Sequence, residues 1–198
     1  TLQEHEKHLE QVFDKLRKFQ LLAHPEKCHL FMRDVQYLGI GINSTGLSIM
    51  EHRKKAILDW PTPEFGGGTK GGKRGKKDGK TAMRSFLGIT GFFRKFIEGY
   101  AQIAAPLTDL TKEDVQWTWG IAEENAFNEL KHRITSAPVL QVPDPSKPFL
   151  VQPDCSGSAV GGSLLQNQGR GMRPCAYISF KLSPTQQRWP AYERELFA

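Results

Sequence analysis

Two stretches near the C-terminal end decide the fold: PFLVQPDCSGSAVGGSLLQ (residues 148–166) and AYISFKLSPTQQRWPAYERELFA (residues 176–198). The first places Asp154 at the end of an apolar run, and the second places Glu195 within a helical pattern. Carboxylates on two separate elements are typical of a site for a divalent metal, because hard cations take oxygen ligands. The sequence stops at Ala198, so we expect this chain to hold only part of that site.

The composition is that of an ordinary globular protein. With 198 residues, 38% of them hydrophobic, the chain is long enough for one large or two small domains. No apolar run approaches the length of a membrane span, and the N-terminal residues are too polar for a signal peptide. The three cysteines, Cys28, Cys155 and Cys175, are odd in number and far apart. They indicate a reducing, intracellular compartment, cytoplasmic or nuclear, and argue against a disulfide framework or a thiolate zinc site.

The positive charge is concentrated in one segment. Residues 66–80, GGGTKGGKRGKKDGK, carry a net +5 and leave only +1 of the net +6 for the rest of the chain. The segment has no apolar periodicity, and we interpret residues 64–83 as a flexible insertion. A nuclear-targeting or nucleic-acid patch around Lys73–Lys77 is the alternative. A P-loop is excluded, because Arg74 occupies the position of the required glycine before Gly79.

Apolar periodicity predicts the elements on either side of this segment. Before it, we expect helices over residues 4–20 and 52–60 and strands over residues 28–32, 35–42 and 46–50, with a turn at 43–46. After it, we expect helices over residues 84–100, 101–110, 122–134 and from 191 onward, and strands over residues 149–154, 160–166 and 175–180. Three consecutive strands followed by a helix indicate an α+β or α/β domain.

The blocks of sequence, in this order, resemble the pol polyprotein of LTR retrotransposons of the gypsy class. KCHLF with VQYLGIGINSTGLSI resembles the end of the reverse transcriptase palm. RSFLGITGFFRKFIEGYAQIAAPLTDLTK resembles the thumb and the start of the connection. WTW, AFNELKHRITSAPVL and the two opening stretches resemble the first half of the RNase H domain.

This resemblance implies an α+β architecture in four parts. Residues 1–63 would form the end of the palm with a hairpin like the primer grip, and residues 84–113 the thumb and connection helices. Residues 114–198 would form an RNase H-like α/β domain, a mixed sheet with helices, truncated at its C-terminal end. Residues 64–83 depart from the family, which has a short helical connector there.

The resemblance also implies a catalytic pair and a cofactor. Asp154, in an Asp-Cys-Ser motif, matches the first RNase H carboxylate, and Glu195, in Glu-Arg-Glu-Leu, matches the second. In the family such acids hold Mg²⁺ for phosphodiester cleavage. Glu193 competes with Glu195 for this role, but only one of them can face Asp154, and we expect Tyr192 and Leu196 to face the sheet.

A second set of residues would contact the template–primer duplex or RNA–DNA hybrid. By resemblance, Tyr37, Leu38 and Gly39 belong to the primer grip, although an apolar strand by default makes Tyr37 and Leu38 core. The Phe-rich helix from Arg84 would pack by its Phe residues. Its polar face would follow the duplex and contact phosphates, through Arg84, Ser85, Thr90 and Arg94.

We therefore expect a piece of a reverse transcriptase–ribonuclease H that lacks complete polymerase and nuclease sites. A non-catalytic nucleic-acid-binding remnant or domesticated module is the first alternative, and a scaffold that binds proteins is the second. The sequence leaves the oligomeric state open.

Overall fold

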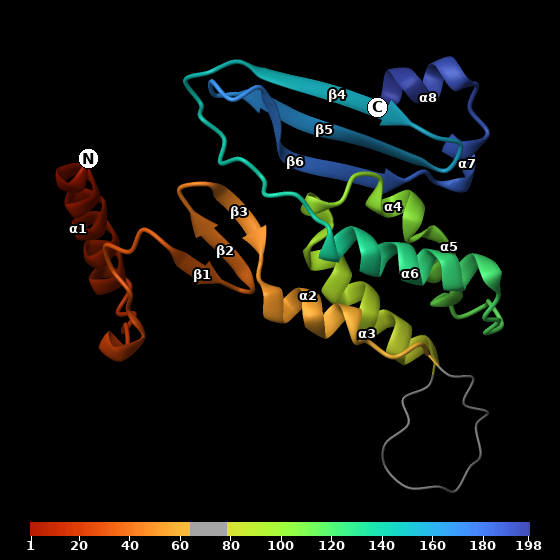
Figure 1. The fold of residues 1–198 in the computed structure, drawn as a ribbon, viewed down its shortest axis with the longest axis horizontal. Coiled ribbons are helices and arrows are strands. Elements are labelled where there is room, and N and C mark those ends of the chain that lie inside the picture. Colours follow the sequence, from red (N-terminus) through yellow and green to blue (C-terminus); the bar gives the residue numbers. More distant parts are fainter. Residues whose placement is uncertain (64–78) are drawn as a thin grey trace, which may run out of the picture. The chain divides into compact units, whose positions relative to one another are not determined.

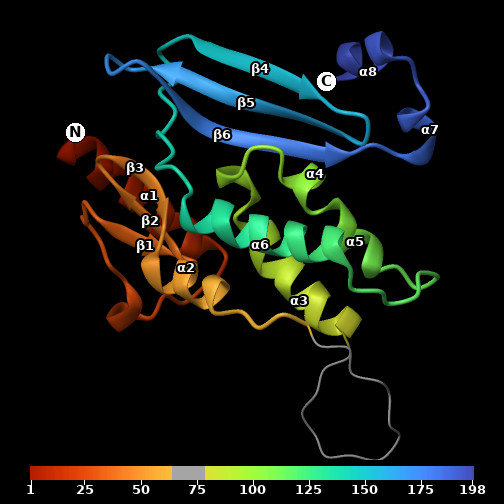
Figure 2. The same ribbon diagram turned by 45° about the vertical axis from the view of Figure 1, so that its right-hand side comes forward.

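The computed structural model describes residues 1–63 and 79–198, which form two compact units, Thr1–Arg33 and Asp34–Ala198 (Figures 1 and 2). Residues 64–78, most of the predicted insertion, lie outside the described residues.

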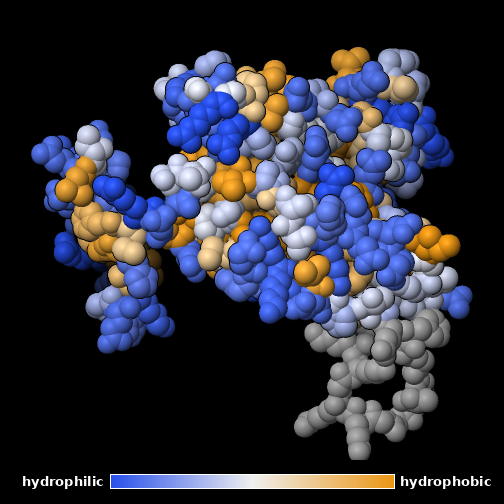
Figure 3. Space-filling model, in the orientation of Figure 1, coloured by the Kyte–Doolittle hydropathy of each residue, from blue (hydrophilic) through white to orange (hydrophobic). Residues whose placement is uncertain are grey.

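The first unit is a helix followed by irregular chain. Helix α1, Leu2–Lys18, begins with a capping box in which the Thr1 hydroxyl accepts from the Glu4 backbone N–H at 3.3 Å. None of its residues is buried, and apolar side chains lie on its surface (Figure 3). A short 3-10 helix, η1, spans Pro25–Lys27. The strand predicted for residues 28–32 is wrong, because Phe31 takes a left-handed φ of 59° and the described part of this unit offers no strand to pair with.

A small antiparallel sheet opens the second unit, from strands β1 (Val35–Tyr37), β2 (Ile40–Asn43) and β3 (Gly46–Ile49). The single strand predicted over residues 35–42 is instead two, because Leu38 (φ 51°) and Gly39 (φ 86°) turn the chain back. Tyr37 and Leu38 are therefore 62% and 60% exposed, and their assignment to the core is wrong. The predicted turn over residues 43–46 is confirmed.

Helices pack beside this sheet and form the main core. They are α2 (Glu51–Leu58), α3 (Gly79–Phe92), the 3-10 helix η2 (Arg94–Phe96), α4 (Tyr100–Ile103), α5 (Ala105–Leu110) and α6 (Ile121–Thr135). Phe86 of α3 and Phe127 of α6 are fully buried, with ring centroids 4.5 Å apart. Burial of such rings is the main stabilising contribution of the core.

The helix predicted over residues 84–100 is wrong at both ends. It begins at Gly79, within the predicted insertion, because Met83 is fully buried and Gly79 packs against Trp117. It stops at Phe92, and the left-handed Gly99 (φ 65°) redirects the chain before α4 begins.

A second antiparallel sheet completes the unit, in the order β4 (Phe149–Cys155), β5 (Ala159–Asn167) and β6 (Met172–Lys181). Two short helices follow, α7 (Pro184–Gln187) and α8 (Ala191–Phe197). The expected α+β class is confirmed, and both described sheets are antiparallel throughout. In α8, however, Tyr192 and Leu196 are 64% and 85% exposed, so the prediction that they face the sheet is wrong.

Candidate functional site

Asp154 lies on β4 directly opposite Gly161 of β5 in the strand register. Because Gly161 and the adjacent Gly162 carry no side chains, nothing from β5 covers the Asp154 carboxylate. Both glycines are also close-packed, since a Cβ at either position would lie 3.2 Å from a backbone oxygen of a neighbouring strand. The sequence Gly-Gly thus lets the three strands approach closely and leaves the carboxylate exposed.

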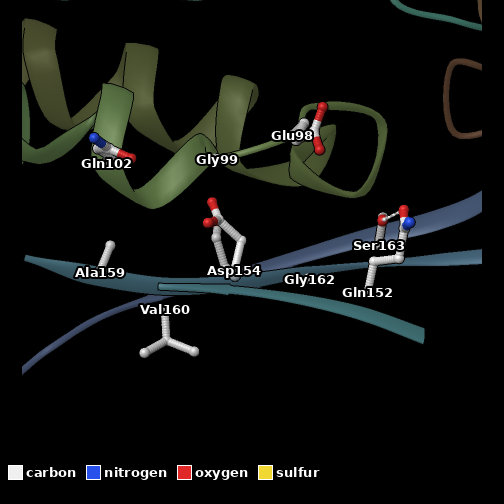
Figure 4. A pocket seen from close by; sticks show the side chains of 11 residues that line it. Glu98, Gly99, Gln102, Gln152, Asp154, Ala159, Val160, Gly162 and Ser163 are labelled. Carbon is white, nitrogen blue, oxygen red and sulfur yellow. Dashed lines mark hydrogen bonds between the residues drawn. The ribbon is translucent and has the colours of Figure 1, made fainter. Parts of the chain in front are cut away.

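The Asp154 carboxylate opens into a small pocket between β4, β5 and the turn that leads into α4. Figure 4 shows it pointing away from the sheet toward the segment that carries Glu98 and Gln102, whereas Val160 points to the opposite side. The pocket has a volume of ≈ 20 Å³, enough for about one water-sized group. Glu98 was not identified from the sequence, because only the fold brings it opposite β4.

The α4 wall of the pocket is fixed to the sheet. The Ala101 backbone N–H donates to the Ser179 hydroxyl of β6 at 2.9 Å. Beneath α4, the Tyr100 hydroxyl and Thr90 hydroxyl share a hydrogen bond of 2.9 Å in the core. Burial raises the pKa of Tyr100 and, with the nearby Glu98 carboxylate, that of Tyr177. Both phenols therefore stay neutral at physiological pH.

Glu195 lies on α8, exposed, and does not line the pocket that contains Asp154. Its neighbour Arg194 approaches the turn after β4, where its guanidinium donates to the Ser156 carbonyl oxygen at 3.3 Å. The structure thus anchors α8 near the strand that carries Asp154 through Arg194, and it pairs Asp154 with Glu98 in one pocket.

Asp154 and Glu98, with the amide oxygens of Gln102 and Gln152, are oxygen donors of the kind that a hard divalent cation takes. In donor chemistry the pocket fits such an ion. Across residues 1–63 and 79–198, however, no group of three or more His, Cys, Asp and Glu side chains is close enough to hold a metal.

One of the predicted primer-grip residues, Leu38, lines a second, largely apolar pocket. Leu38, at the β1–β2 turn, lines it together with Arg53 of α2, with Ile89 and Phe92 near the end of α3, and with Phe93 directly after it. A Cβ on Gly39 would lie 2.8 Å from the Arg53 side chain, so the glycine lets α2 approach the turn. The structure therefore brings Leu38 to the end of α3 and Gly39 to Arg53 of α2, while Tyr37 stays exposed.

The predicted duplex-facing residues of the Phe-rich helix divide into two groups. Arg84 and Arg94 are both exposed, and the Arg84 guanidinium donates to the Thr111 carbonyl oxygen at 2.7 Å. Thr90 is fully buried, so its placement on the polar face is wrong; it satisfies the Tyr100 hydroxyl instead. Ser85 is partly buried and donates to the Thr81 carbonyl oxygen, one turn earlier.

The chain is similar in sequence to known proteins. Residues 119–198 match the RNase H-like domain found in reverse transcriptase. The chain is 34% identical over 179 residues to the Gag-Pol polyprotein of Koala retrovirus and 30% identical over 196 residues to the transposon Tf2-3 polyprotein of Schizosaccharomyces pombe. These alignments cover 90% and 98% of the chain but only 10% and 14% of the two polyproteins.

A solved structure shares the fold of the whole chain. The foamy viral protease-reverse transcriptase in complex with an RNA/DNA hybrid aligns with a TM-score of 0.70 at 24% identity, over 100% of this chain and 25% of that one. In the described residues, no helix is both long and apolar enough to cross a membrane.

Proposed function

We propose that this chain, a homologue of retroviral Gag-Pol and retrotransposon polyproteins with an RNase H-like domain of the reverse transcriptase type, acts on nucleic acid as part of a reverse transcriptase–ribonuclease H. The observation that carries the proposal is the exposed Asp154 carboxylate, which the glycines of β5 leave uncovered within the matched domain. The whole protein would copy RNA into DNA and cleave the RNA strand of RNA–DNA hybrids.

RNase H-like domains generally use divalent metals, and for this chain we propose Mg²⁺. Asp154 and Glu195 would contribute carboxylate ligands, and when bound the ion would activate water and stabilise the leaving oxygen. Within this chain, β4 presents the Asp154 carboxylate at its surface, and the Ala101–Ser179 hydrogen bond joins the α4 side of the pocket to the sheet. Glu98, which lines the same pocket as Asp154, would add a further oxygen donor.

The partner we propose is an RNA–DNA hybrid or template–primer duplex, contacted through Tyr37, Leu38, Gly39, Arg84 and Arg94. Exposed arginines make phosphate contacts without sequence preference, and exposed apolar side chains at a turn pack against sugars. The three free cysteines, Cys28, Cys155 and Cys175, support an intracellular location, cytoplasmic or nuclear.

The test is the Asp154→Asn variant in a reverse transcriptase–ribonuclease H that contains this chain. Loss of a residue that only hydrogen-bonds to a metal ligand lowers metal affinity or activity by roughly 10–100-fold. Replacement of the ligand itself should lower activity at least as much. We expect Mg²⁺-dependent cleavage of the RNA strand to fall by at least that factor, with hybrid affinity little changed. Glu113→Gln, at an exposed residue outside the Asp154 pocket, is the control, and it should leave cleavage intact. Equal cleavage by the wild-type protein and the Asp154→Asn variant would show that Asp154 has no catalytic role.

One observation favours a second candidate function, a non-catalytic nucleic-acid-binding module. Glu195 stands outside the Asp154 pocket, and the described ranges contain no three-donor metal cluster. Such a module would bind duplexes weakly, without sequence preference and with strong salt dependence. Absence of Mg²⁺-dependent cleavage by the wild-type protein, together with salt-sensitive duplex binding by this chain, would establish it.

A further inference from the structure

A polar pocket lies at the opposite end of the β4–β6 sheet from Asp154. It is formed where the β5–β6 hairpin meets the β2–β3 hairpin, and its volume is ≈ 240 Å³. Its polar lining comes from Ser44, Thr45, Gln141, Gln168, Arg170 and Arg173. Figure 3 shows hydrophilic side chains gathered over this end of the sheet. None of the residues predicted from the sequence for catalysis or nucleic-acid binding lines this pocket.

The two sides of the pocket are joined by backbone hydrogen bonds. Leu47 and Leu140 form a bridge in which each backbone N–H donates to the other's carbonyl oxygen, at 2.7 and 2.8 Å. Gly46 makes this approach possible, because a Cβ there would collide with the Leu140 carbonyl oxygen. The β2–β3 hairpin is thereby held against the chain that leads to β4, so the pocket is an ordered feature of the unit.

The floor of the pocket is ordered by glutamines. Gln168 donates through its side-chain amide to the Val142 carbonyl oxygen at 2.8 Å and to the Gln166 side-chain oxygen at 2.7 Å. Gln141, which is 7% exposed, donates to the Gln166 carbonyl oxygen at 3.2 Å. Polar groups with fixed partners need little reorganisation to receive a ligand.

The charge in the pocket is positive and not compensated by its lining. Arg170 and Arg173 both line it, no acidic residue does, and neither arginine forms a salt bridge with any other described residue. The nearest acidic residue along the adjoining loop, Asp144, is itself paired with Lys147 at 3.4 Å. Guanidinium groups beside hydroxyls form the donor set that recognises phosphate oxygens.

We propose that this pocket is an anion site that takes a phosphate group, with Arg170 and Arg173 as the charged donors and Ser44 as a neutral donor. The source is either the backbone of a bound nucleic acid or free inorganic phosphate. The backbone source rests on the proposed function, since it would add a contact to the same duplex far from Asp154.

The experiment compares the whole chain with its Arg170→Gln/Arg173→Gln double variant in two assays. In the first, a labelled RNA–DNA hybrid is titrated at several salt concentrations. We expect the double variant to bind on the order of tenfold more weakly and the slope of log affinity against log salt to fall by roughly 0.9 for each lost contact. In the second, inorganic phosphate is titrated while NMR follows the Ser44–Gly46 backbone amides and the Gln168 side-chain amide.

Two further variants separate a specific site from general charge. Arg17→Gln/Arg133→Gln removes the same charge from exposed arginines that are paired with acids elsewhere, and it should lower hybrid affinity much less. Ser44→Asp keeps both arginines but places a carboxylate among them, and it should reproduce the loss.

The results distinguish the two sources. Weaker hybrid binding specific to the pocket variants identifies backbone phosphate. Arginine-dependent phosphate shifts with unchanged hybrid binding identify free phosphate. The proposal is overturned if the pocket and control double variants behave alike in both assays. The phosphate titration does not involve Asp154, which lines a different pocket, so failure of the proposed catalytic role would not remove this site.

Discussion

At the scale of single residues, replacing glycine by alanine should have opposite effects on stability at Gly46 and at Gly88. Gly46 has a φ of 135°, which side chains rarely adopt, and its Cβ would meet the Leu140 carbonyl oxygen. We expect Gly46→Ala to destabilise the second unit by more than ~1 kcal/mol. Gly88 lies within α3 with open space around it, so Gly88→Ala should stabilise by about 0.5–1 kcal/mol. Urea denaturation of the two variants, monitored by circular dichroism, measures both changes, and a shift of the midpoint in the same direction would contradict this account.

A buried hydroxyl pair provides the second residue-scale prediction. Thr90 and Tyr100 share a 2.9 Å hydrogen bond in the core, and Thr90 is fully buried. Thr90→Val keeps the shape but leaves the Tyr100 hydroxyl with only a long, 3.5 Å contact to the Leu87 carbonyl oxygen. We expect a loss of ~1–3 kcal/mol in the free energy of unfolding. In the Thr90→Val/Tyr100→Phe double variant both hydroxyls are gone, and part of that loss should be recovered. A double variant less stable than Thr90→Val would show that the pair is not coupled in this way.

At the scale of elements, Asp109 joins α5 to the end of β6. Its carboxylate accepts from Lys181 at 2.7 and 2.8 Å and pairs with Lys112 at 2.7 Å. Partial burial acts to raise the pKa of Asp109, but the hydrogen bonds from the two lysines outweigh it and hold the pKa below its ordinary value. Because the pKa of Asp109 is lower in the folded than in the unfolded state, its ionised carboxylate stabilises the fold. This contribution is complete above the unfolded pKa of about 3.9 and is lost as the pH falls through the folded pKa.

The stability difference between the wild-type chain and Asp109→Asn should therefore be present at neutral pH and shrink below about pH 4. Because the carboxylate is 44% exposed, solvent screens the pair, and the difference at neutral pH should be small. Thermal melts from pH 7 down to pH 3 measure it, with Asp114→Asn as the control for loss of one exposed acid. If the stability difference between the two proteins stayed constant over this range, it would arise from packing and not from the charge of Asp109.

The same elements show which parts of the fold the sequence could predict. Helix α6 and strands β4–β6 appear within a few residues of their predicted bounds, because their apolar residues recur with a clear helical or strand-like pattern. The β1–β2 turn was missed, since Leu38 and Gly39 occupy left-handed positions where Asn-Gly is the usual signal. In the site, Asp154 could be placed on its strand. Glu98 and the Arg170–Arg173 pocket could not be identified, because they depend on contacts between distant segments.

At the scale of the whole molecule, the two units differ in how they are stabilised. The second unit has a continuous core that includes Phe86, Phe127 and Leu140, all fully buried. The first has no buried residue in α1, and its helix depends on its capping box and on exposed pairs such as Arg17 with Asp14. Exposed pairs of this kind contribute only about 0.3–0.5 kcal/mol each, and helices without tertiary packing are marginal in water.

Hydrogen exchange on the whole chain tests this difference directly. Amides of α1 should open with a free energy near zero and exchange within the shortest labelling times. Those of α6 should exchange only through global unfolding of the second unit, because α6 buries four side chains, Ala126, Phe127, Leu130 and Ile134. Added urea should therefore accelerate α6 strongly and leave α1 almost unaffected. If Leu2–Lys18 were protected as strongly as α6, α1 would have to be stabilised by packing that its exposed side chains do not show. The apolar residues on its surface would then be the first candidates for that packing.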